Sequence, residues 1–382
     1  MLYRKMPRIK EELSILGFGC MRLPTRNKEV GEIDEPTAAR MMNTAIDNGV
    51  NYIDTARPYH GGKSEPFVGR ALKGLRDKVQ LATKLPSWLI AKKEDLDFHL
   101  NEQLEQLQTD HIDFYLLHAL SSSRWENLLK FDVMDFMEKA RAAGKIRYIC
   151  FSFHDGIDTF KKIVDAYPWD MCQIQFNFLD EYYQAGTEGL KYARGKDIGV
   201  VVMEPLKGGT ISIPVPEDCA ATARAAGYAK PTLTDLGLRW VWNHAEVGLL
   251  LSGMSAPDQM DQNVESAAKG VCDALTPKEL ELVKAAKDLF ASRVRVSCTA
   301  CAYCMPCPKG VEIPQCFRNL NDAALSEKWE AQKVSYNYLL SDSRGGGKAS
   351  ACVECGACET QCPQHIPIRE KLKEVVAAFE TN

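Results

Sequence analysis

Cysteines are concentrated near the end of the chain, and their spacing is that of metal ligands. Of the 14 cysteines, nine lie between Cys298 and Cys362, and eight of these nine form two groups. The first group is Cys298, Cys301, Cys304 and Cys307, the second is Cys352, Cys355, Cys358 and Cys362, and a proline follows the last cysteine of each. Two residues between successive cysteines let one tight loop supply three thiolates to a cubane cluster, while the fourth comes from elsewhere. The spacing therefore predicts two [4Fe–4S] clusters.

The assignment of ligands follows from the way two-cluster ferredoxins share their cysteines, since the fourth cysteine of each run serves the other cluster. One cluster is assigned to Cys298, Cys301, Cys304 and Cys362, and the other to Cys352, Cys355, Cys358 and Cys307. Only two residues, rather than the usual three, separate Cys304 from Cys307, so Cys316 is an alternative to Cys307 as the fourth ligand. We prefer to interpret Cys316 as a buried apolar thiol. Paired zinc sites are the alternative, but zinc normally takes two cysteine pairs separated by a longer loop.

A second set of reactive side chains lies in the first third of the chain, after three successive apolar runs. The set is Asp54, Tyr59, Lys84 and His118. A tyrosine hydroxyl is a weak acid with a pKa of about 10, and a nearby ammonium lowers that pKa. An aspartate would keep the ammonium charged and placed, and a histidine can orient a substrate oxygen. Together they would donate a proton to an alkoxide that forms as a carbonyl accepts hydride. Singly, each has a structural explanation as a helix cap, a packing ring, a surface lysine or a core histidine.

The elements that must position these residues alternate between strand and helix patterns. Eight apolar runs without strict alternation, typical of strands buried on both faces of a parallel sheet, are 14–20, 51–55, 79–85, 112–119, 146–153, 171–178, 199–206 and 248–254. Helical spacing fills segments between them, such as 36–48, 92–107, 125–143 and 232–245. The fold class is therefore α/β, a (β/α)8 TIM barrel whose strand ends carry the reactive residues. A doubly wound sheet is the competitor, but no G-x-G-x-x-G occurs.

The chain is long enough for two domains. We expect a barrel over 1–275, a connecting helix over 276–296 and a small α-helical ferredoxin-type domain over 297–382. A long loop is expected at the active face of the barrel over 207–231.

Composition limits the partners and the compartment. The net charge of −4 gives no electrostatic reason to expect nucleic acid, and no apolar window is long enough for a membrane helix. The N-terminus lacks a secretory pattern, and a disulfide framework belongs to small secreted chains, so we expect a cytoplasmic protein.

The barrel residues resemble those of a known family. Asp54, Tyr59, Lys84 and His118 are similar to the catalytic tetrad of the aldo-keto reductases, and 18–23 and 173–177 resemble that family's first and sixth strands. With the cysteines appended, the chain resembles the ferredoxin-tailed branch of the family over nearly its whole length. The resemblance implies hydride transfer between NAD(P)H and a small aldehyde, ketone or alcohol. Tyr59 would be the proton donor, tuned by Lys84 and Asp54, while His118 would orient the substrate oxygen.

The resemblance also implies cofactor contacts. Gln175 would hold the nicotinamide carboxamide with help from Ser152, and Met203 stands where many members stack an aromatic ring. The adenosine phosphate and adenine would be held by Gly253, Ser255, Gln259 and Asn263.

Several positions depart from the family pattern. Phe153 replaces an asparagine found in many members. Gly253 and Gln259 offer no charge to the 2′-phosphate of NADPH, so the cofactor is either NADH or NADPH. Glu204 would lie near the cofactor, with an ion pair to Lys207 as its structural explanation. Trp88 either lines the substrate pocket or packs on the surface.

Three functions fit two redox systems on one chain, because hydride carries two electrons whereas a [4Fe–4S] cluster takes one. The first is a carbonyl reductase or alcohol dehydrogenase in which the clusters are structural or transfer electrons. The second is an electron-transfer protein in which substrate or flavin feeds the clusters and a ferredoxin- or flavodoxin-like carrier. No flavin-specific motif is present, although Gly208 and Gly209 could serve either cofactor. The third, a sensor or scaffold, is disfavoured by the complete tetrad.

Overall fold

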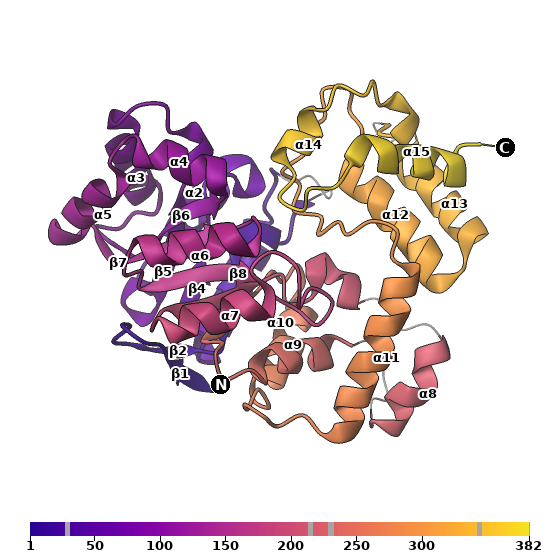
Figure 1. Ribbon diagram of the computed structural model, residues 1–382, viewed down its shortest axis with the longest axis horizontal. Coiled ribbons are helices and arrows are strands. Elements are labelled where there is room, and N and C mark those ends of the chain that lie inside the picture. The colour runs from indigo at the N-terminus through magenta and orange to yellow at the C-terminus, as the bar shows by residue number, and fades with distance from the viewer. Residues whose placement is uncertain (27–30, 213–216, 228–232, 342–345, 382) are drawn as a thin grey trace. The chain divides into compact units, whose positions relative to one another are not determined.

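The chain forms two compact units. A computed structural model describes residues 1–26, 31–212, 217–227, 233–341 and 346–381 (Figure 1). The first unit comprises Met1–Pro205 and Gly237–Leu275, and the second comprises Leu206–Leu236 and Thr276–Asn382. The segment that follows the seventh barrel strand is therefore packed with the cysteine-bearing part of the chain.

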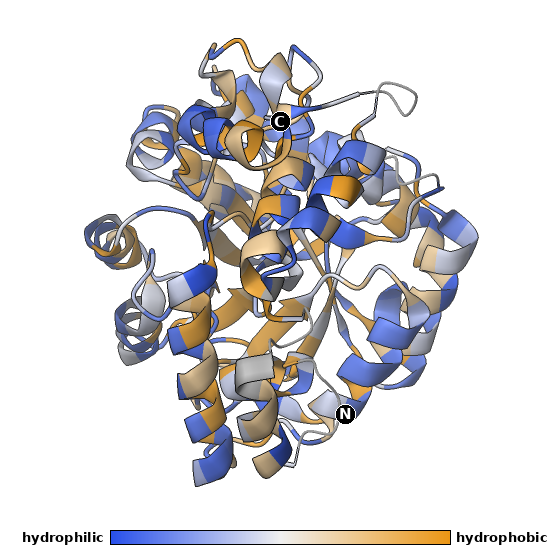
Figure 2. Cartoon of the chain, turned by 90° about the vertical axis from the view of Figure 1, so that its right-hand side faces the viewer, coloured by the Kyte–Doolittle hydropathy of each residue, from blue (hydrophilic) through white to orange (hydrophobic). Residues whose placement is uncertain are grey.

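The first unit is a closed barrel of eight parallel strands in the order β10-β3-β4-β5-β6-β7-β8-β9, which confirms the predicted fold class. The strands are β3 (Leu16–Gly19), β4 (Tyr52–Asp54), β5 (Gln80–Leu85), β6 (Ile112–Leu120), β7 (Ile146–Phe153), β8 (Met171–Gln175), β9 (Gly199–Met203) and β10 (Leu249–Ser252). Figure 2 shows these strands as mostly hydrophobic and the surrounding helices as mixed in hydropathy. Because both faces of each strand are buried, the apolar runs were continuous rather than alternating.

Helices connect the strands of the barrel. They are α1 (Glu35–Asp47), α2 (Ser64–Ala71), α3 (Glu94–Gln106), α4 (Ser122–Leu129), α5 (Val133–Ala142), α6 (Ile157–Ala166), α7 (Gly186–Gly195), α9 (Thr234–Trp242) and α10 (Pro257–Ala267). The single helical segment expected over 125–143 is instead two helices. Asp132 separates them in a left-handed conformation with φ of 54°, which a continuing right-handed helix cannot accommodate.

A short hairpin at the N-terminus, which the sequence did not predict, packs into the barrel interior. Its strands are β1 (Tyr3–Lys5) and β2 (Glu12–Ser14), which pair antiparallel. Met6, Ile9 and Leu13 are buried in one apolar cluster with side chains of the barrel strands. Gly248 leaves room for this packing, because an added Cβ would lie 2.1 Å from Met6 Sδ.

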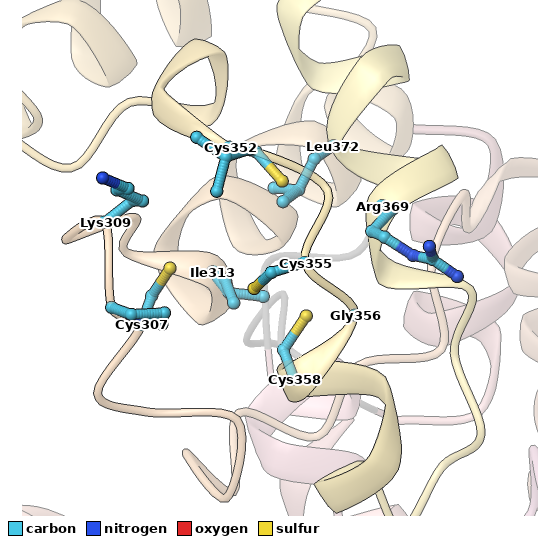
Figure 3. A pocket seen from close by; sticks show the side chains of 11 residues that line it. Cys307, Lys309, Ile313, Cys352, Cys355, Gly356, Cys358, Arg369 and Leu372 are labelled. Carbon is cyan, nitrogen blue, oxygen red and sulfur yellow. The ribbon is translucent and has the colours of Figure 1, made fainter.

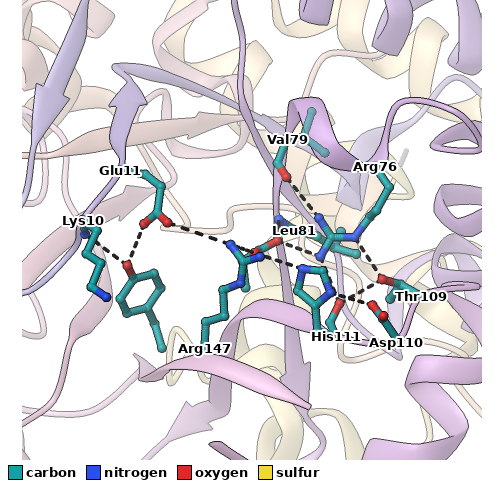
Figure 4. A network of polar contacts seen from close by, with 11 residues as sticks. Lys10, Glu11, Arg76, Val79, Leu81, Thr109, Asp110, His111 and Arg147 are labelled. Carbon is teal, nitrogen blue, oxygen red and sulfur yellow. Dashed lines mark hydrogen bonds and ion pairs between the residues drawn. The ribbon is translucent and has the colours of Figure 1, made fainter. Parts of the chain in front are cut away.

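A polar network joins the starts of three barrel strands (Figure 4). The buried Asp113 accepts hydrogen bonds from the backbone N–H of Leu81 at 2.8 Å and from Arg76 at 2.7 Å. Its second oxygen lies 3.1 Å from Arg147 Nη1, and Arg147 in turn approaches Glu11 at 3.9 Å. Asp113 therefore neutralises two arginines and fixes the register of β5 beside β6.

The second unit is helical in its described residues. It contains α8 (Glu217–Ala225), α11 (Pro277–Arg293), α12 (Ile313–Ser326), α13 (Trp329–Leu339), α14 (Ala357–Gln361) and α15 (Ile368–Phe379). The segment 276–296, expected to be a connecting helix, contains α11, which Thr276 and Glu279 begin with a reciprocal capping box. The expected loop over 207–231 instead contains α8, which packs on α11, and parts of it (213–216 and 228–231) lie outside the described residues.

One apolar core serves the whole cysteine region. Most of its buried members come from α12, α13 and α15, and they include Phe317, Tyr336 and Phe379. Six of the eight predicted ligands pack against this core, namely Cys298, Cys304, Cys307, Cys352, Cys358 and Cys362. In the parts of the chain that the structure describes, no helix has the length and apolar composition needed to cross a membrane.

The charge of Asp113 is expected to stabilise the barrel. Replacing it with Asn leaves the partly exposed Arg76 and Arg147 without this counter-charge, so the free energy of unfolding should fall by about 1.5 to 3 kcal/mol. Urea denaturation followed by tryptophan fluorescence measures this change. The matched control is Asp110→Asn, since the Asp110 side chain is 94% exposed and should change stability by less than about 0.5 kcal/mol. Equal effects of the two substitutions would contradict the role given to Asp113.

Candidate functional site

Lys84 lies at the centre of a buried polar cluster at the C-terminal ends of β4, β5 and β6. Its side chain is fully buried, and its Nζ donates to both Asp54 carboxylate oxygens at 2.7 and 2.8 Å and to the Thr55 carbonyl at 2.9 Å. A longer contact of 3.5 Å joins Nζ to the Tyr59 hydroxyl. Parallel pairing of β4 with β5 brings these residues together, since Asp54 stands opposite Ala82, two residues before Lys84. The structure thus brings the Lys84 ammonium to 3.5 Å from the phenol oxygen of Tyr59.

His118 lies beside this cluster. Its ring and the Tyr59 ring meet edge-on, with centroids 6.3 Å apart, and both side chains are buried. Burial lowers the pKa of His118 well below its usual value, and the positive charges of Lys84, His154 and Arg124 lower it further. His118 is therefore neutral at physiological pH. A neutral imidazole offers one N–H to a substrate oxygen without adding a second buried charge beside Lys84.

The carboxyl of Asp54 is subject to opposing effects. Burial raises its pKa, while the charge of Lys84 and the hydrogen bonds that it donates lower it. A buried carboxylate and ammonium are stable together only when both are well hydrogen-bonded. The three short bonds of Lys84 Nζ meet this requirement.

Trp88 lies against the reactive cluster. The Trp88 and His118 rings have centroids 5.0 Å apart, and the Trp88 side chain stays 37% exposed. Arg124 Cζ lies 5.4 Å from the Trp88 ring, and Arg124 Nη1 donates to the Ala119 carbonyl at 2.8 Å. Arg124 was not singled out from the sequence, although its position shortly after the strand of His118 is a signal. Trp88 and Arg124 thus border the cluster on its exposed side.

The residues expected to hold the nicotinamide lie at the ends of the next strands. Ser152 is buried at the end of β7, where its hydroxyl accepts the Ala119 N–H at 2.7 Å. Gln175 ends β8 and pairs in register with Met203 at the end of β9. The Gln175 amide donates to Asp180 at 2.8 Å, which fixes the side chain. The three residues share the rim that carries the tetrad.

The residues expected at the adenosine end gather where β10 leads into α10. The Ser255 N–H donates to the Gln259 side chain at 2.8 Å, and Asn263 donates to Ser252 at 2.9 Å. Sequence reasoning placed no cation here, but the structure brings Arg22 to this point. An added Cβ at Gly253 would lie 3.0 Å from the Arg22 side chain. Arg22 lies in the short turn that follows β3, a strand that neighbours β10 only because the barrel closes.

Glu204 is the counter-charge of Arg22. The two side chains form an ion pair at 3.5 Å and are mostly buried. Glu204 has a left-handed backbone with φ of 55°, and its carbonyl accepts from Asn177 at 3.0 Å. The pair therefore spans from β9 to β3 across the end of β10.

Cys304 lies near the three other cysteines assigned to the same cluster. Burial raises the pKa of Cys304, and negative charge on Cys301, Cys298 and Cys362 raises it further. A bound iron cluster would stabilise the thiolates that repel one another here. Within the described residues, no three His, Cys, Asp or Glu side chains are arranged to hold a single metal ion.

The second cysteine group lines one pocket. Its lining includes Cys307, Cys352, Cys355 and Cys358, and Figure 3 shows their sulfur atoms turned toward a shared space. Cys307 comes from the first group and lines this pocket together with three cysteines of the second group. Four thiols around one space are the donor set that a [4Fe–4S] cluster takes.

Cys316 lies apart from both groups. It is fully buried in the apolar core of α12, and its thiol donates to the Gly347 carbonyl at 3.7 Å. Burial raises the pKa of Cys316 to about 12. This environment favours a packed neutral thiol over an iron ligand.

Comparisons with known proteins divide the chain in two. The model of the Aldo/keto reductase family matches residues 15–287, and the model of the 4Fe-4S dicluster domain matches residues 297–366. Curated relatives include L-galactose dehydrogenase of Arabidopsis thaliana, 26% identical over 282 residues that cover 68% of this chain and 85% of that protein. NADH-specific methylglyoxal reductase of Escherichia coli is 25% identical and covers 69% of this chain and 92% of that protein.

Solved structures are similar to the barrel. An aldo-keto reductase of Bacillus halodurans in its holo form has a TM-score of 0.61 and 28% identity, covering 75% of this chain and 96% of that one. An aldo-keto reductase of Klebsiella pneumoniae in complex with NADPH has a TM-score of 0.59 and 23% identity, with the same coverage, and supports the fold alone.

The iron content of cysteine variants tests whether Cys307 or Cys316 is a cluster ligand. We expect Cys307→Ala to lose about half of the bound iron, because one of two four-thiolate sets becomes incomplete. Cys316→Ala should keep its full iron and sulfide content and lose only packing stability. Iron, sulfide and visible absorbance of anaerobically purified protein measure this. Loss of iron in Cys316→Ala with retention in Cys307→Ala would exchange their roles.

Proposed function

Because the chain belongs to the aldo/keto reductase family, we propose that it transfers hydride between NAD(P)H and a small aldehyde, ketone or alcohol. The observation that carries the proposal is the buried Lys84 ammonium, which binds Asp54 at 2.7 Å and lies 3.5 Å from the Tyr59 hydroxyl. Packing alone would not favour a lysine at a fully buried strand end, since an ammonium is expensive to bury. A phenol that must release its proton benefits from that charge.

In the direction of carbonyl reduction, Tyr59 gives its proton to the substrate oxygen. A bound nicotinamide would supply hydride to the carbonyl carbon, so that a C–H bond forms as the C=O π bond breaks. Lys84 stabilises the phenolate that remains on Tyr59, and Asp54 holds Lys84 in place by accepting two hydrogen bonds from its Nζ. His118, being neutral, donates its N–H to the substrate oxygen and orients the carbonyl. Solvent then returns a proton to Tyr59, and alcohol oxidation follows the reverse path.

The proposed cofactor contacts form two groups along the rim. Ser152, Gln175 and Met203 would face the nicotinamide, since they end consecutive strands beyond the tetrad. Gly253, Ser255, Gln259 and Asn263 would face the adenosine phosphate and adenine. Arg22 lies against Gly253 and is a cation for a phosphate there. Both NADH and NADPH are consistent with this arrangement.

We further propose that the eight cysteines hold two [4Fe–4S] clusters, with the ligands shared between the groups as the spacing predicts. Such clusters supply one-electron chemistry, and nicotinamide would need a mediator such as flavin to reduce them. The domain boundaries after 275 and 296 and a cytoplasmic location, where thiols stay reduced, belong to the same proposal.

Loss of the Tyr59 hydroxyl tests the reductase. Tyr59→Phe should lower kcat for methylglyoxal reduction with NADPH or NADH by a factor of about 100 to 10,000, the usual contribution of a positioned general acid. The affinity for nicotinamide, measured by fluorescence titration, should remain, because the ring is retained. Tyr182→Phe is the control, since Tyr182 is 94% exposed. Full activity of Tyr59→Phe would exclude Tyr59 as the proton donor.

The pH profile tests the state of His118. Because the pKa of His118 is lowered, the side chain stays neutral as the pH falls through the ordinary histidine pKa of about 6.5. We therefore expect kcat/KM for aldehyde reduction to show no acid inflection near pH 6.5. The profile of His118→Asn, which keeps a neutral donor, should have the same shape at a lower rate. An inflection near pH 6.5 that disappears in His118→Asn would contradict a neutral His118.

A further inference from the structure

The two three-cysteine loops have matching backbones. In each, the residue two positions after the first cysteine has a left-handed conformation, with φ of 52° at Ala300 and 55° at Glu354. The N–H of each of these residues donates to that first cysteine's sulfur, at 3.3 Å for Cys298 and 3.4 Å for Cys352. The loops are therefore local copies of one geometry, and any difference between them comes from what surrounds each one.

Their surroundings differ sharply. Thr299 follows the first cysteine of one loop and is 1% exposed, whereas Val353 stands at the same position of the other loop and is 58% exposed. Cys355 is exposed, but the matching Cys301 is only partly so. Backbone covers the first loop, because an added Cβ at Gly208 would lie 2.2 Å from the Thr299 carbonyl oxygen. The second loop presents an apolar side chain and a cysteine to solvent.

The pocket of the second loop is bordered by cations. Lys309 and Arg369 are the ionisable residues, apart from the cysteines, among the residues that line it, and Figure 3 shows them on opposite sides of the thiols. The nearby carboxylates are neutralised: Glu359 pairs with Arg369 at 2.8 Å, and Glu354 pairs with Lys373 at 3.0 Å. Lys309 is exposed and has no acidic side chain within ion-pair distance among the described residues.

We propose that the Cys352–Cys358 loop together with Lys309 is the docking surface for an acidic one-electron carrier protein. The proposal rests on the proposed pair of clusters. Val353 supplies apolar area that a partner can bury, and Lys309 attracts acidic side chains at the rim. A cluster held by these thiolates would exchange single electrons, so the carrier gains one electron for each that the cluster loses.

Binding to two carriers of opposite charge tests the surface. The holo-protein is titrated with an acidic plant-type [2Fe–2S] ferredoxin and, separately, with basic cytochrome c, by calorimetry at low and high ionic strength. We expect the ferredoxin to bind and the affinity to fall with salt, because complementary charges are screened. Lys309→Glu and Val353→Glu should each weaken binding by about tenfold or more. Lys284→Glu, which makes the same charge change on an exposed lysine of α11, should leave binding within about twofold.

The titrations and the variants can each contradict the proposed docking surface. Any one of three results would overturn the docking surface. The first is that Lys309→Glu and Lys284→Glu weaken binding equally, the second is that cytochrome c binds as well as the ferredoxin, and the third is that the ferredoxin does not bind the holo-protein. Iron and sulfide content are measured for each variant, so that loss of a cluster is not mistaken for loss of docking. The titration contains neither nicotinamide nor carbonyl substrate. Tyr59→Phe should therefore bind the ferredoxin like the unchanged protein, whatever becomes of the reductase proposal.

Discussion

The buried ion pair between Lys84 and Asp54 is the constraint on which the barrel's chemistry depends. An ammonium without exposure to solvent is stable only if its hydrogens find acceptors, and here two carboxylate oxygens and the Thr55 carbonyl provide them. The acceptors come from β4 and the lysine from β5. The charge can therefore be satisfied only when these strands are paired in their native register, and the register that satisfies it also brings the Tyr59 hydroxyl to Lys84.

The strands could be predicted from sequence because burial on both faces leaves a local mark, a short continuous apolar run. Residues at the ends of such runs, among them Asp54 and His118, then fall on one rim of a closed parallel barrel. The N-terminal hairpin escaped prediction because its strands have three residues each and mixed polarity. The break at Asp132 depends on a single left-handed residue, which is invisible to helical periodicity.

Other parts of the site depend on barrel closure, which no local pattern encodes. Arg22 reaches Gly253 because the first and last barrel strands, β3 and β10, pair with each other. Its ion pair with Glu204 then ties two strand ends that are distant in sequence. The local sequence correctly shows that Gly253 and Gln259 carry no charge. It does not reveal that the fold brings the cation of Arg22 next to Gly253. The stacking of Arg124 on Trp88 likewise joins two different strand-to-helix connections.

In the cysteine region, the cysteine spacing determines the loop conformation, whereas the rest of the chain determines how exposed each loop is. Spacing sets the loop conformation, and both loops accordingly share left-handed residues and an N–H donated to sulfur. Exposure is set by segments far away in sequence, such as the one containing Gly208, whose backbone covers Thr299 and has no counterpart over the exposed Val353 within the described chain. Solvent access and nearby charge tune iron–sulfur chemistry as strongly as the ligands do. Two loops with the same cysteine spacing are therefore placed in different environments, and among the described residues the second loop is the more exposed of the two.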